Sequence, residues 1–353
     1  MTTLTTSESN ILYLGLAGTG KTTTLIEHAT TALSEGKNIL YLLPHEQLKN
    51  ETIQKHHLLK DHVHTFHTLA LYDLNLLKDG ELSSREMDSP YNKSYPNVAY
   101  YFLLSWWISN FRISSFTNYD CIILDGLHDL NKEMIDMLNI LVSLNEGVKI
   151  IAAGDPYQIT FYHNEGTVNK VFEVFEKQYS PLSIIEMNNN YRSSVSIQKC
   201  LNGYYEKQFN GERFYNLENY KTEQYSDDVF IHNIKKRSDL NNFIKDIVDL
   251  YPAKKITILG RFSNEVEDIQ QQLKLINYNI FCSRINDYKT EECDVVVLIN
   301  TILNYKSDLI EEKNLINIAI SRAKEKIHIV SLYADKTVLP SVKENTYSFF
   351  NYQ

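Results

Sequence analysis

Cysteine is scarce in this chain of 353 residues, and the four cysteines lie far apart along it. They are Cys121, Cys200, Cys282 and Cys293, and no two of them form a C-x-x-C pair. Because zinc sites and disulfide frameworks use recurring, closely spaced cysteines, this spacing argues against both. It predicts reduced thiols that are mostly buried.

Long hydrophobic runs are also missing. No apolar stretch approaches the roughly 20 residues that a membrane-spanning helix needs, and residues 1–10 carry neither a basic segment nor the apolar core of a secretory signal. With 43% hydrophobic and 22% charged residues, the composition is that of a globular protein. We therefore expect a cytoplasmic protein without a membrane partner and, at about 150 residues per domain, with two domains.

Positive charge is in deficit, since the formal net charge is −9. Such a chain has no overall attraction to phosphate backbones, so nucleic-acid binding would require a local basic groove. The 24 tyrosines could stack on bases or could reflect biased codon usage. Composition alone does not favour a nucleic-acid partner.

Short apolar runs alternate with helix-compatible segments in the first half of the chain. Strands are expected at residues 11–14, 38–43, 121–124 and 149–152, with helices at 22–34, 99–111 and 132–144. The same alternation returns after residue 190. There, strands are expected at residues 229–232, 256–259, 280–282, 294–298 and 326–331, with helices at 240–250, 264–275 and 309–321.

Strands that alternate with helices predict an α/β fold with parallel sheets covered on both faces. We place one domain at residues 1–189, with a short insertion at about 73–118, and a second at residues 190–353. The polar, tyrosine-rich stretch 203–228 has little periodicity and is expected to be a loop or linker.

A phosphate-binding loop follows the first expected strand. Residues 15–22 read GLAGTGKT and match G-x-x-x-x-G-K-[ST] between a strand and a helix, the setting that this motif requires. A connecting glycine-rich turn is the alternative. The residues expected to bind ATP and its Mg²⁺ here are Gly15, Gly18, Thr19, Gly20, Lys21 and Thr22.

The chemistry of this loop explains its residue types. Glycines let backbone N–H groups approach the phosphates, and the following helix N-terminus favours negative charge. Lys21 is expected to reach the β- and γ-phosphates, and the Thr22 hydroxyl to hold Mg²⁺. Asp125, at the end of a later apolar run, is the candidate carboxylate beside the metal ion, although an aspartate in that position is often only a turn residue.

Four further segments resemble motifs of superfamily 1 helicases of the UvrD type, in the order of that family. Residues 65–70 resemble T-F-H-[GST]-L, 154–158 resemble G-D-x-x-Q, 190–193 resemble N-Y-R-S and 319–324 resemble A-[LI]-[ST]-R-A-[KR]. With the phosphate loop they span nearly the whole chain. The resemblance implies two RecA-like P-loop NTPase domains whose parallel sheets are flanked by helices.

The resemblance also implies roles for single residues. Gln158, with Asp155 or its neighbourhood, would face the γ-phosphate, Arg192 and Arg322 would clamp it, and Tyr191 would stack on the base. Guanidinium groups are suited to this task because they stabilise the charge of phosphoryl transfer. The structural alternatives are arginines paired on helix surfaces, a tyrosine in the core and a glutamine that caps a turn.

The chain departs from the family at the motif D-E-x-x-D, which here is Asp125-Gly126-Leu127-His128-Asp129. Gly126 has no side chain to polarise the attacking water, and losing a catalytic base costs about 10²–10⁴ in rate. His128 or Asp129 could substitute, although neither stands at the expected step of the chain. ATP binding with weakened hydrolysis is therefore expected, and Gly126→Glu is expected to raise turnover.

Residues expected beside a nucleic-acid strand are few. Phe66 and His67 lie in the T-F-H segment, Phe161 keeps the aromatic that follows G-D-x-x-Q, and His163 stands where the family has part of a Trp-Arg pair. An early motif that often carries an aromatic reads Leu-Pro-His at residues 43–45. Base stacking contributes about 1–3 kcal/mol per base, so these losses weaken the nucleic-acid side.

Two other features bear on partners. The family has a late motif K-G-L-E-F-D, and the corresponding residues 289–294 of this chain read KTEECD. The chain keeps Glu292, which would contact the ribose, but it lacks the glycine of the motif. In the short insertion, Trp106 and Trp107 either pack in a core or form a surface for a strand or a partner protein.

Two functions remain open at this point. The first is an ATP-dependent translocase or helicase on single-stranded nucleic acid, expected to be DNA. The second is a nucleotide-gated subunit that regulates a nuclease or another protein in a repair or phage-defence complex. A small-molecule P-loop kinase shares the phosphate loop but leaves the four later motifs unexplained.

Overall fold

The computed structural model divides the chain into two compact units. Unit 1 comprises Met1–Leu14, Lys21–Pro156 and Phe161–Glu186, and unit 2 comprises Gly15–Gly20, Tyr157–Thr160 and Met187–Gln353. The structure describes residues 9–73, 77–78, 81–82, 103–105, 107–109, 116–159, 170–209, 214–217, 228–234, 236–275, 280–288, 291–299, 310–332 and 348–352.

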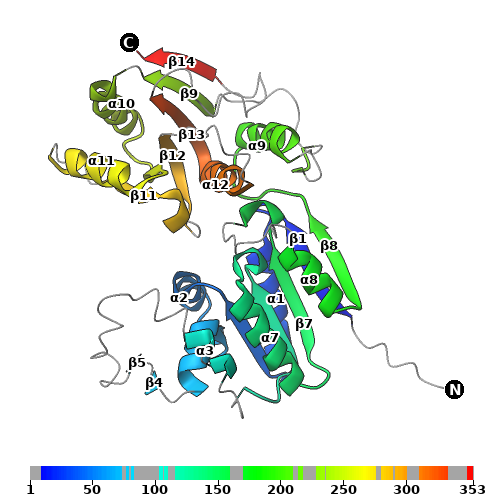
Figure 1. Cartoon of the computed structure of the whole chain (residues 1–353). Helices are drawn as coiled ribbons and strands as arrows, with labels where there is room; N and C mark the ends of the chain where they lie inside the picture. The colour runs from blue at the N-terminus through cyan, green and yellow to red at the C-terminus, as the bar shows by residue number, and fades with distance from the viewer. Residues whose placement is uncertain are drawn as a thin grey trace. The chain divides into compact units, whose positions relative to one another are not determined.

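Unit 1 is built on a six-stranded sheet in the order β3-β2-β6-β7-β1-β8. Its strands are β1 (Asn10–Gly15), β2 (Ile39–Leu43), β3 (Val63–Thr65), β6 (Cys121–Asp125), β7 (Lys149–Gly154) and β8 (Leu182–Met187). Its helices are α1 (Lys21–Ser34), α2 (Glu46–Lys55), α3 (Phe66–Asp73), α7 (Lys132–Leu144) and α8 (Lys170–Gln178) (Figure 1). A separate antiparallel pair joins β4 (Leu77–Lys78) to β5 (Glu81–Leu82).

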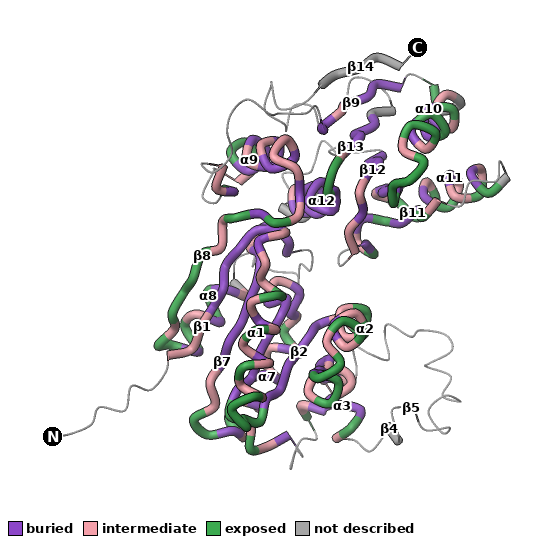
Figure 2. The backbone as a smooth tube through the Cα atoms, turned by 180° about the vertical axis from the view of Figure 1, so that it is seen from behind, coloured by how far each residue is buried: buried purple, intermediate pink, exposed green. Residues whose placement is uncertain are grey.

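The inner strands of unit 1 are apolar because both faces of the sheet are covered there. Every residue of β2 and of β6 is buried, and Figure 2 shows β2 buried among helices with exposed faces, whereas β8 is largely exposed. The pairings from β3 to β1 are parallel. The carboxyl ends of β1, β2, β6 and β7 therefore lie at one edge, where α/β sheets bind their ligands.

Unit 2 contains a second six-stranded parallel sheet, in the order β11-β10-β12-β13-β9-β14. Its strands are β9 (Val229–Ile234), β10 (Ile256–Gly260), β11 (Phe281–Arg284), β12 (Cys293–Ile299), β13 (Ala323–Leu332) and β14 (Ser348–Tyr352). Its helices are α9 (Val195–Gln208), α10 (Arg237–Leu250), α11 (Ser263–Leu275) and α12 (Ile310–Ser321). The predicted α/β class, with two parallel sheets flanked by helices, is confirmed.

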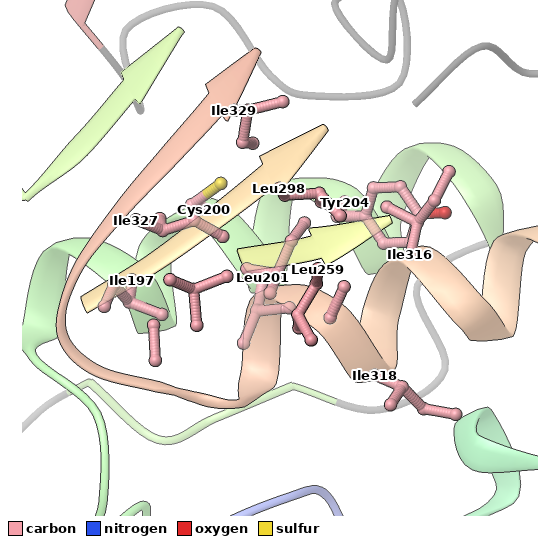
Figure 3. Close-up of a cluster of buried hydrophobic side chains, with 14 of the residues drawn as sticks. Ile197, Cys200, Leu201, Tyr204, Leu259, Leu298, Ile316, Ile318, Ile327 and Ile329 are labelled. Carbon is pink, nitrogen blue, oxygen red and sulfur yellow. The ribbon is translucent and has the colours of Figure 1, made fainter. Parts of the chain in front are cut away.

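Alternate residues of the central strands of unit 2 feed two separate cores. On β12, Val296 and Leu298 pack with α9 and α12, whereas Val295 and Val297 pack with α10 and α11. This follows from the two-residue period of a strand, which sends successive side chains to opposite faces. Figure 3 shows the first core, in which Leu298 lies among side chains of α9 and α12.

The stretch 203–228 is not the linker that its composition suggests, at least at its start. Helix α9 continues through Tyr204 and Tyr205, which are both fully buried. Their hydroxyls donate to Lys313 O at 3.0 Å and to Asn317 Oδ1 at 2.8 Å. Tyrosine is polar only at its tip, so a helix can bury it when that tip finds an acceptor.

The four cysteines are buried free thiols, as predicted. Trp107 is 1% exposed and its Nε1 donates to Asp73 Oδ2 at 3.1 Å, so its side chain belongs to the core of unit 1. Trp106, most of the predicted insertion, and Phe161 and His163 lie outside the described residues. No helix within the described ranges is long and apolar enough to cross a membrane.

Candidate nucleotide-binding site

The phosphate loop connects β1 to α1 and depends on glycine at two positions. Gly18 and Gly20 have φ angles of +74° and +86°, in the left-handed region that disfavours side chains. A Cβ on Gly18 would lie 2.8 Å from Arg192 Cβ. Thr19 is buried and its Oγ1 donates to Leu16 O at 2.8 Å, which fixes the bend of the loop.

Within unit 2, the N-Y-R-S segment donates hydrogen bonds to backbone carbonyl groups of the phosphate loop. The Tyr191 N–H donates to Gly18 O at 2.8 Å, and Asn190 Nδ2 donates to Ala17 O at 3.1 Å. The hydroxyl of Tyr215 donates to the same Ala17 oxygen at 2.9 Å. Three donors therefore bind two consecutive carbonyls of the loop.

Asn190 also shapes its own segment. Its Oδ1 accepts the backbone N–H groups of Arg192 and Ser193, each at 2.8 Å, and this turn precedes α9. This role of Asn190 was not expected from the sequence. The signal was its place in the motif, because asparagine bonds readily to the backbone of nearby turns.

Tyr191 itself is the most exposed aromatic side chain near the loop, at 78%. A Cβ on Gly20 would lie 3.7 Å from its ring. Core packing, one alternative for this residue, is therefore wrong. A free ring face beside the phosphate loop suits stacking on a base, which stays a prediction.

Arg192 and Arg322 lie in one polar cluster of unit 2. Arg192 contacts Glu292 Oε1 at 2.5 Å and donates to Ser321 O at 3.3 Å. Arg322 is 3% exposed, and its Nη2 donates to Gln158 Oε1 at 3.2 Å. The alternative of arginines on a helix surface does not fit this burial.

The cluster carries an excess of positive charge. Glu292 also contacts Lys324 Nζ at 3.4 Å, so one carboxylate faces three cations. Burial acts to raise the pKa of Glu292, but Arg192, Lys324 and Arg322 outweigh it and hold the pKa below its ordinary value. Unit 2 thus contains a local cluster of positive charge within an acidic chain.

The two motifs of this cluster are joined through the backbone. The Ser193 hydroxyl donates to Ala323 O and the Ser194 N–H donates to Lys324 O, each at 2.8 Å. Arg192 therefore comes from the turn before α9, Arg322 from the residue between α12 and β13, and Lys324 from the start of β13. Glu292 directly precedes β12 and forms an ion pair with Arg192. Its role as a ribose contact stays a prediction.

Gln158 is positioned by helix α12. Asn317 Nδ2 donates to Tyr157 O and Asn314 Nδ2 donates to Ile159 O, each at 2.7 Å. Both asparagines are fully buried. They hold the backbone on either side of Gln158, which gives α12 a function that the sequence analysis did not assign.

Within unit 1, Lys21 and Thr22 begin α1 beside Asp125 at the end of β6. The Thr22 hydroxyl hydrogen-bonds to Asp125, and Tyr41 OH donates to Asp125 Oδ2 at 3.3 Å. Burial raises the pKa of Asp125, while the bond with Thr22 and the charge of Lys21 act in the opposite direction. The structure thus brings together the three residues assigned to phosphate and metal.

A hydroxyl and a carboxylate in contact are oxygen donors of the kind that Mg²⁺ takes. Within the ranges that the structure describes, no group of three or more His, Cys, Asp or Glu side chains could hold a metal ion. Thr22 and Asp125 therefore suit a Mg²⁺ that completes its shell with phosphate oxygens and water. Mg²⁺ would neutralise phosphate charge there.

Gly126 has φ +88°, and a Cβ there would lie 3.1 Å from Pro44 Cγ. A glutamate would meet both backbone strain and crowding, so the expected gain from Gly126→Glu does not suit this structure. Asp129 is buried next to two histidines, at 3.1 Å from His45 Nε2 and 3.8 Å from His128 Nε2. His45 was not expected to take part in the site from the sequence, although its place directly after the β2 strand was a signal for it.

The T-F-H segment begins α3. The Thr65 N–H donates to Thr68 Oγ1 at 2.8 Å and the Thr68 N–H donates to Thr65 Oγ1 at 3.1 Å, a reciprocal cap of the helix. Phe66 is fully buried, so a ring face for a nucleic-acid base is not available and that prediction does not fit. His67 is half-buried.

Comparison with known proteins supports a P-loop domain at the N-terminus. Residues 2–163 match the model of a family described as AAA domain, a little under half of the chain. This class binds nucleotides, in agreement with the phosphate loop. No curated protein matches the chain.

Two solved structures are among those similar to this chain. The C-terminal domain of a possible DNA helicase from Lactobacillus plantarum WCFS1 is 17% identical, with a TM-score of 0.36, covering 45% of this chain and 98% of that one. The arterivirus nonstructural protein 10, a helicase, is 11% identical, with a TM-score of 0.49, covering 95% of this chain. This chain spans 62% of that helicase.

Proposed function

We propose that this protein is an ATP-binding helicase-core protein of the UvrD type, a motor driven by ATP on single-stranded nucleic acid, with DNA as the expected strand. The observation that carries the proposal is the joining of four motifs in unit 2. The phosphate loop, N-Y-R-S, the glutamine of G-D-x-x-Q and the last arginine motif contact one another directly or through Glu292 and Ser321.

The residues of unit 1 bind the phosphates and the metal ion. Lys21 binds the β- and γ-phosphates, while Thr22 and Asp125 hold Mg²⁺. In unit 2, the N–H groups of residues 15–20 cradle the phosphates and Tyr191 stacks on the base. Arg192 and Arg322 stabilise the charge that develops on the γ-phosphate, and Gln158 orients the attacking water.

Nucleic-acid binding rests on the order of the motifs rather than on a described surface. Phe161 and His163 keep their proposed roles beside the strand, whereas the burial of Phe66 removes one contact. We therefore expect modest affinity for single strands that falls with rising salt concentration, because phosphate contacts release counterions.

Steady-state ATP hydrolysis by the purified chain, with and without single-stranded DNA, tests this proposal. Turnover that rises with DNA and disappears in Lys21→Ala is the expected result. An RNA strand of the same sequence distinguishes the two nucleic acids. If wild type hydrolyses ATP no faster than Lys21→Ala under every condition, the proposal of an ATP-driven motor is wrong.

One observation favours a second function. The left-handed backbone at Gly126 suits glycine and not the glutamate of the helicases that the chain resembles. A nucleotide-gated subunit that regulates a nuclease or another partner protein needs ATP binding but little hydrolysis. Tight ATP binding without turnover, and a change in protease sensitivity on adding ATP, are the results that this function predicts.

A further inference from the structure

Position 126 lacks a side chain, but Pro44, in the loop after β2, fills the space beside it. The Cβ that Gly126 lacks would point at Pro44, with Cγ at 3.1 Å and Cδ at 3.3 Å. Pro44 and His45 form the connection between β2 and α2, and β2 pairs with β6 in parallel. The loop after β2 therefore places Pro44 against position 126, and His45 is the next residue along this loop.

His45 is bound by a buried carboxylate. Its Nε2 lies 3.1 Å from Asp129 Oδ2, and the side chains of His45 and Asp129 are 30% and 6% exposed. Because a carboxylate accepts hydrogen bonds, Nε2 carries the hydrogen and Nδ1 carries the lone pair. Among the residues that the structure describes, nothing bonds to this Nδ1.

The ring of His45 has no structural task in its own helix. It precedes α2 in an extended conformation, φ −124° and ψ 137°, and its side chain makes no cap hydrogen bond. His128 differs, because its Nδ1 accepts the Asp155 N–H at 3.2 Å and its Nε2 faces Asp129 at 3.8 Å. Of the two histidines around Asp129, only His45 keeps an available basic nitrogen.

We infer that His45, oriented by Asp129, is the general base for ATP hydrolysis in place of a glutamate at position 126. The water oxygen bonds to the γ-phosphorus, and the bond from that phosphorus to the bridging oxygen breaks with its electron pair left on ADP. The water proton moves to His45 Nδ1 and then to solvent, so the products are ADP and phosphate. Asp129 stabilises the imidazolium, as carboxylates do behind catalytic histidines.

This inference rests on the proposed ATP hydrolysis. The test compares wild type, His45→Ala, His45→Gln and Lys21→Ala for steady-state turnover and for affinity towards a fluorescent ATP analogue. Turnover should fall about 10²–10⁴-fold in both His45 variants, with nucleotide affinity unchanged. Added imidazole should restore part of the turnover of His45→Ala, which a purely structural role for the ring does not predict.

Matched variants separate chemistry from folding. His56→Ala, at the C-terminal end of α2 and thus 11 residues from His45, should keep wild-type turnover. Asp129→Asn, a change at a positioning residue, should lower kcat at least about tenfold and leave KM unchanged, since an amide stabilises imidazolium less well. Circular dichroism confirms that each variant folds.

The outcomes distinguish the two proposals. Wild-type turnover above Lys21→Ala that survives both His45 substitutions overturns the inference and leaves the proposed function intact. Wild-type turnover no higher than that of Lys21→Ala overturns both. A loss in His45→Ala that imidazole does not restore, together with weaker nucleotide binding, assigns His45 a structural role and also overturns the inference.

Discussion

At the residue scale, a substitution of Tyr191 should change nucleotide binding without changing stability, because the ring is exposed. Replacing it with alanine removes no core contact, so the free energy of unfolding should change by less than about 0.5 kcal/mol. If the ring stacks on the base, nucleotide affinity should fall about two- to tenfold, in line with about 0.5–1.5 kcal/mol for aromatic pairs. Fluorescent nucleotide titration measures this.

Tyr191→Phe is the matched control, because it keeps the ring and removes only the hydroxyl. It should bind ATP as wild type does. Equal affinity of the alanine and wild-type proteins would show that the base lies elsewhere.

Gly126 is the residue where backbone conformation decides the outcome of a substitution. A side chain in the left-handed region costs about 1–2 kcal/mol, and Pro44 leaves little space for a Cβ. Gly126→Glu should therefore lower thermal stability and leave ATP turnover at or below the wild-type rate. A higher turnover with unchanged melting temperature contradicts this and restores the expectation drawn from sequence.

At the element scale, helix α12 positions the G-D-x-x-Q segment by two buried amides. Asn317→Ala removes the hydrogen bonds that Asn317 makes with Tyr157 O and Tyr205 OH, and a buried hydrogen bond contributes about 0.5–1.5 kcal/mol. Because Gln158 then loses its anchor, turnover should fall more than nucleotide affinity. Urea denaturation and steady-state kinetics measure the two effects.

Asn264→Ala, on the exposed start of α11, is the control for this prediction. It should change neither stability nor turnover. If Asn317→Ala behaves in the same way, the contacts of α12 with residues 157–159 do not position the glutamine.

At the scale of the whole molecule, buried histidines make stability depend on pH. In unit 2, burial lowers the pKa of His232 to about 4 and that of His328 to about 3, and in unit 1 burial lowers the pKa of His64 to about 4. In unfolded chains histidine titrates near pH 6.5. Between pH 6.5 and about 4, the unfolded state therefore binds more protons than the folded state.

The free energy of unfolding should consequently fall as pH decreases from 6.5 to 4.5, by up to about 1.4 kcal/mol per pH unit for each histidine. Carboxylates with lowered pKa, such as Glu292, contribute mainly below this window. Urea midpoints at several pH values provide the measurement. The variant His232→Gln should flatten the dependence, whereas an unchanged slope would mean that these histidines do not titrate as their burial implies.

Charge distribution is also a property of the whole chain. The net charge is −9, yet Arg192, Arg322 and Lys324 gather around one carboxylate at the amino edge of the second sheet. Composition averages over such a cluster. It therefore could not show that these three cations lie together, which the contacts of Glu292 do show.

Much of the fold and part of the site were predictable because their causes are local. Apolar runs marked β1, β2, β6 and β7, since strands covered on both faces must be apolar. The phosphate loop was recognisable because Gly18 and Gly20 adopt φ angles that only glycine takes easily. The segments that lacked such signals, including β8, β14 and the continuation of α9, were missed or assigned to a loop.

By itself, the sequence determined the α/β class, the phosphate loop and the order of the helicase-like motifs. Only the tertiary structure decided that Phe66 is buried, that Glu292 pairs with Arg192, and that His45 meets Asp129 from 84 residues away. Local patterns reflect the backbone preferences of neighbouring residues. A long-range contact depends on which strands pair and in which register, and these are settled only when the chain packs.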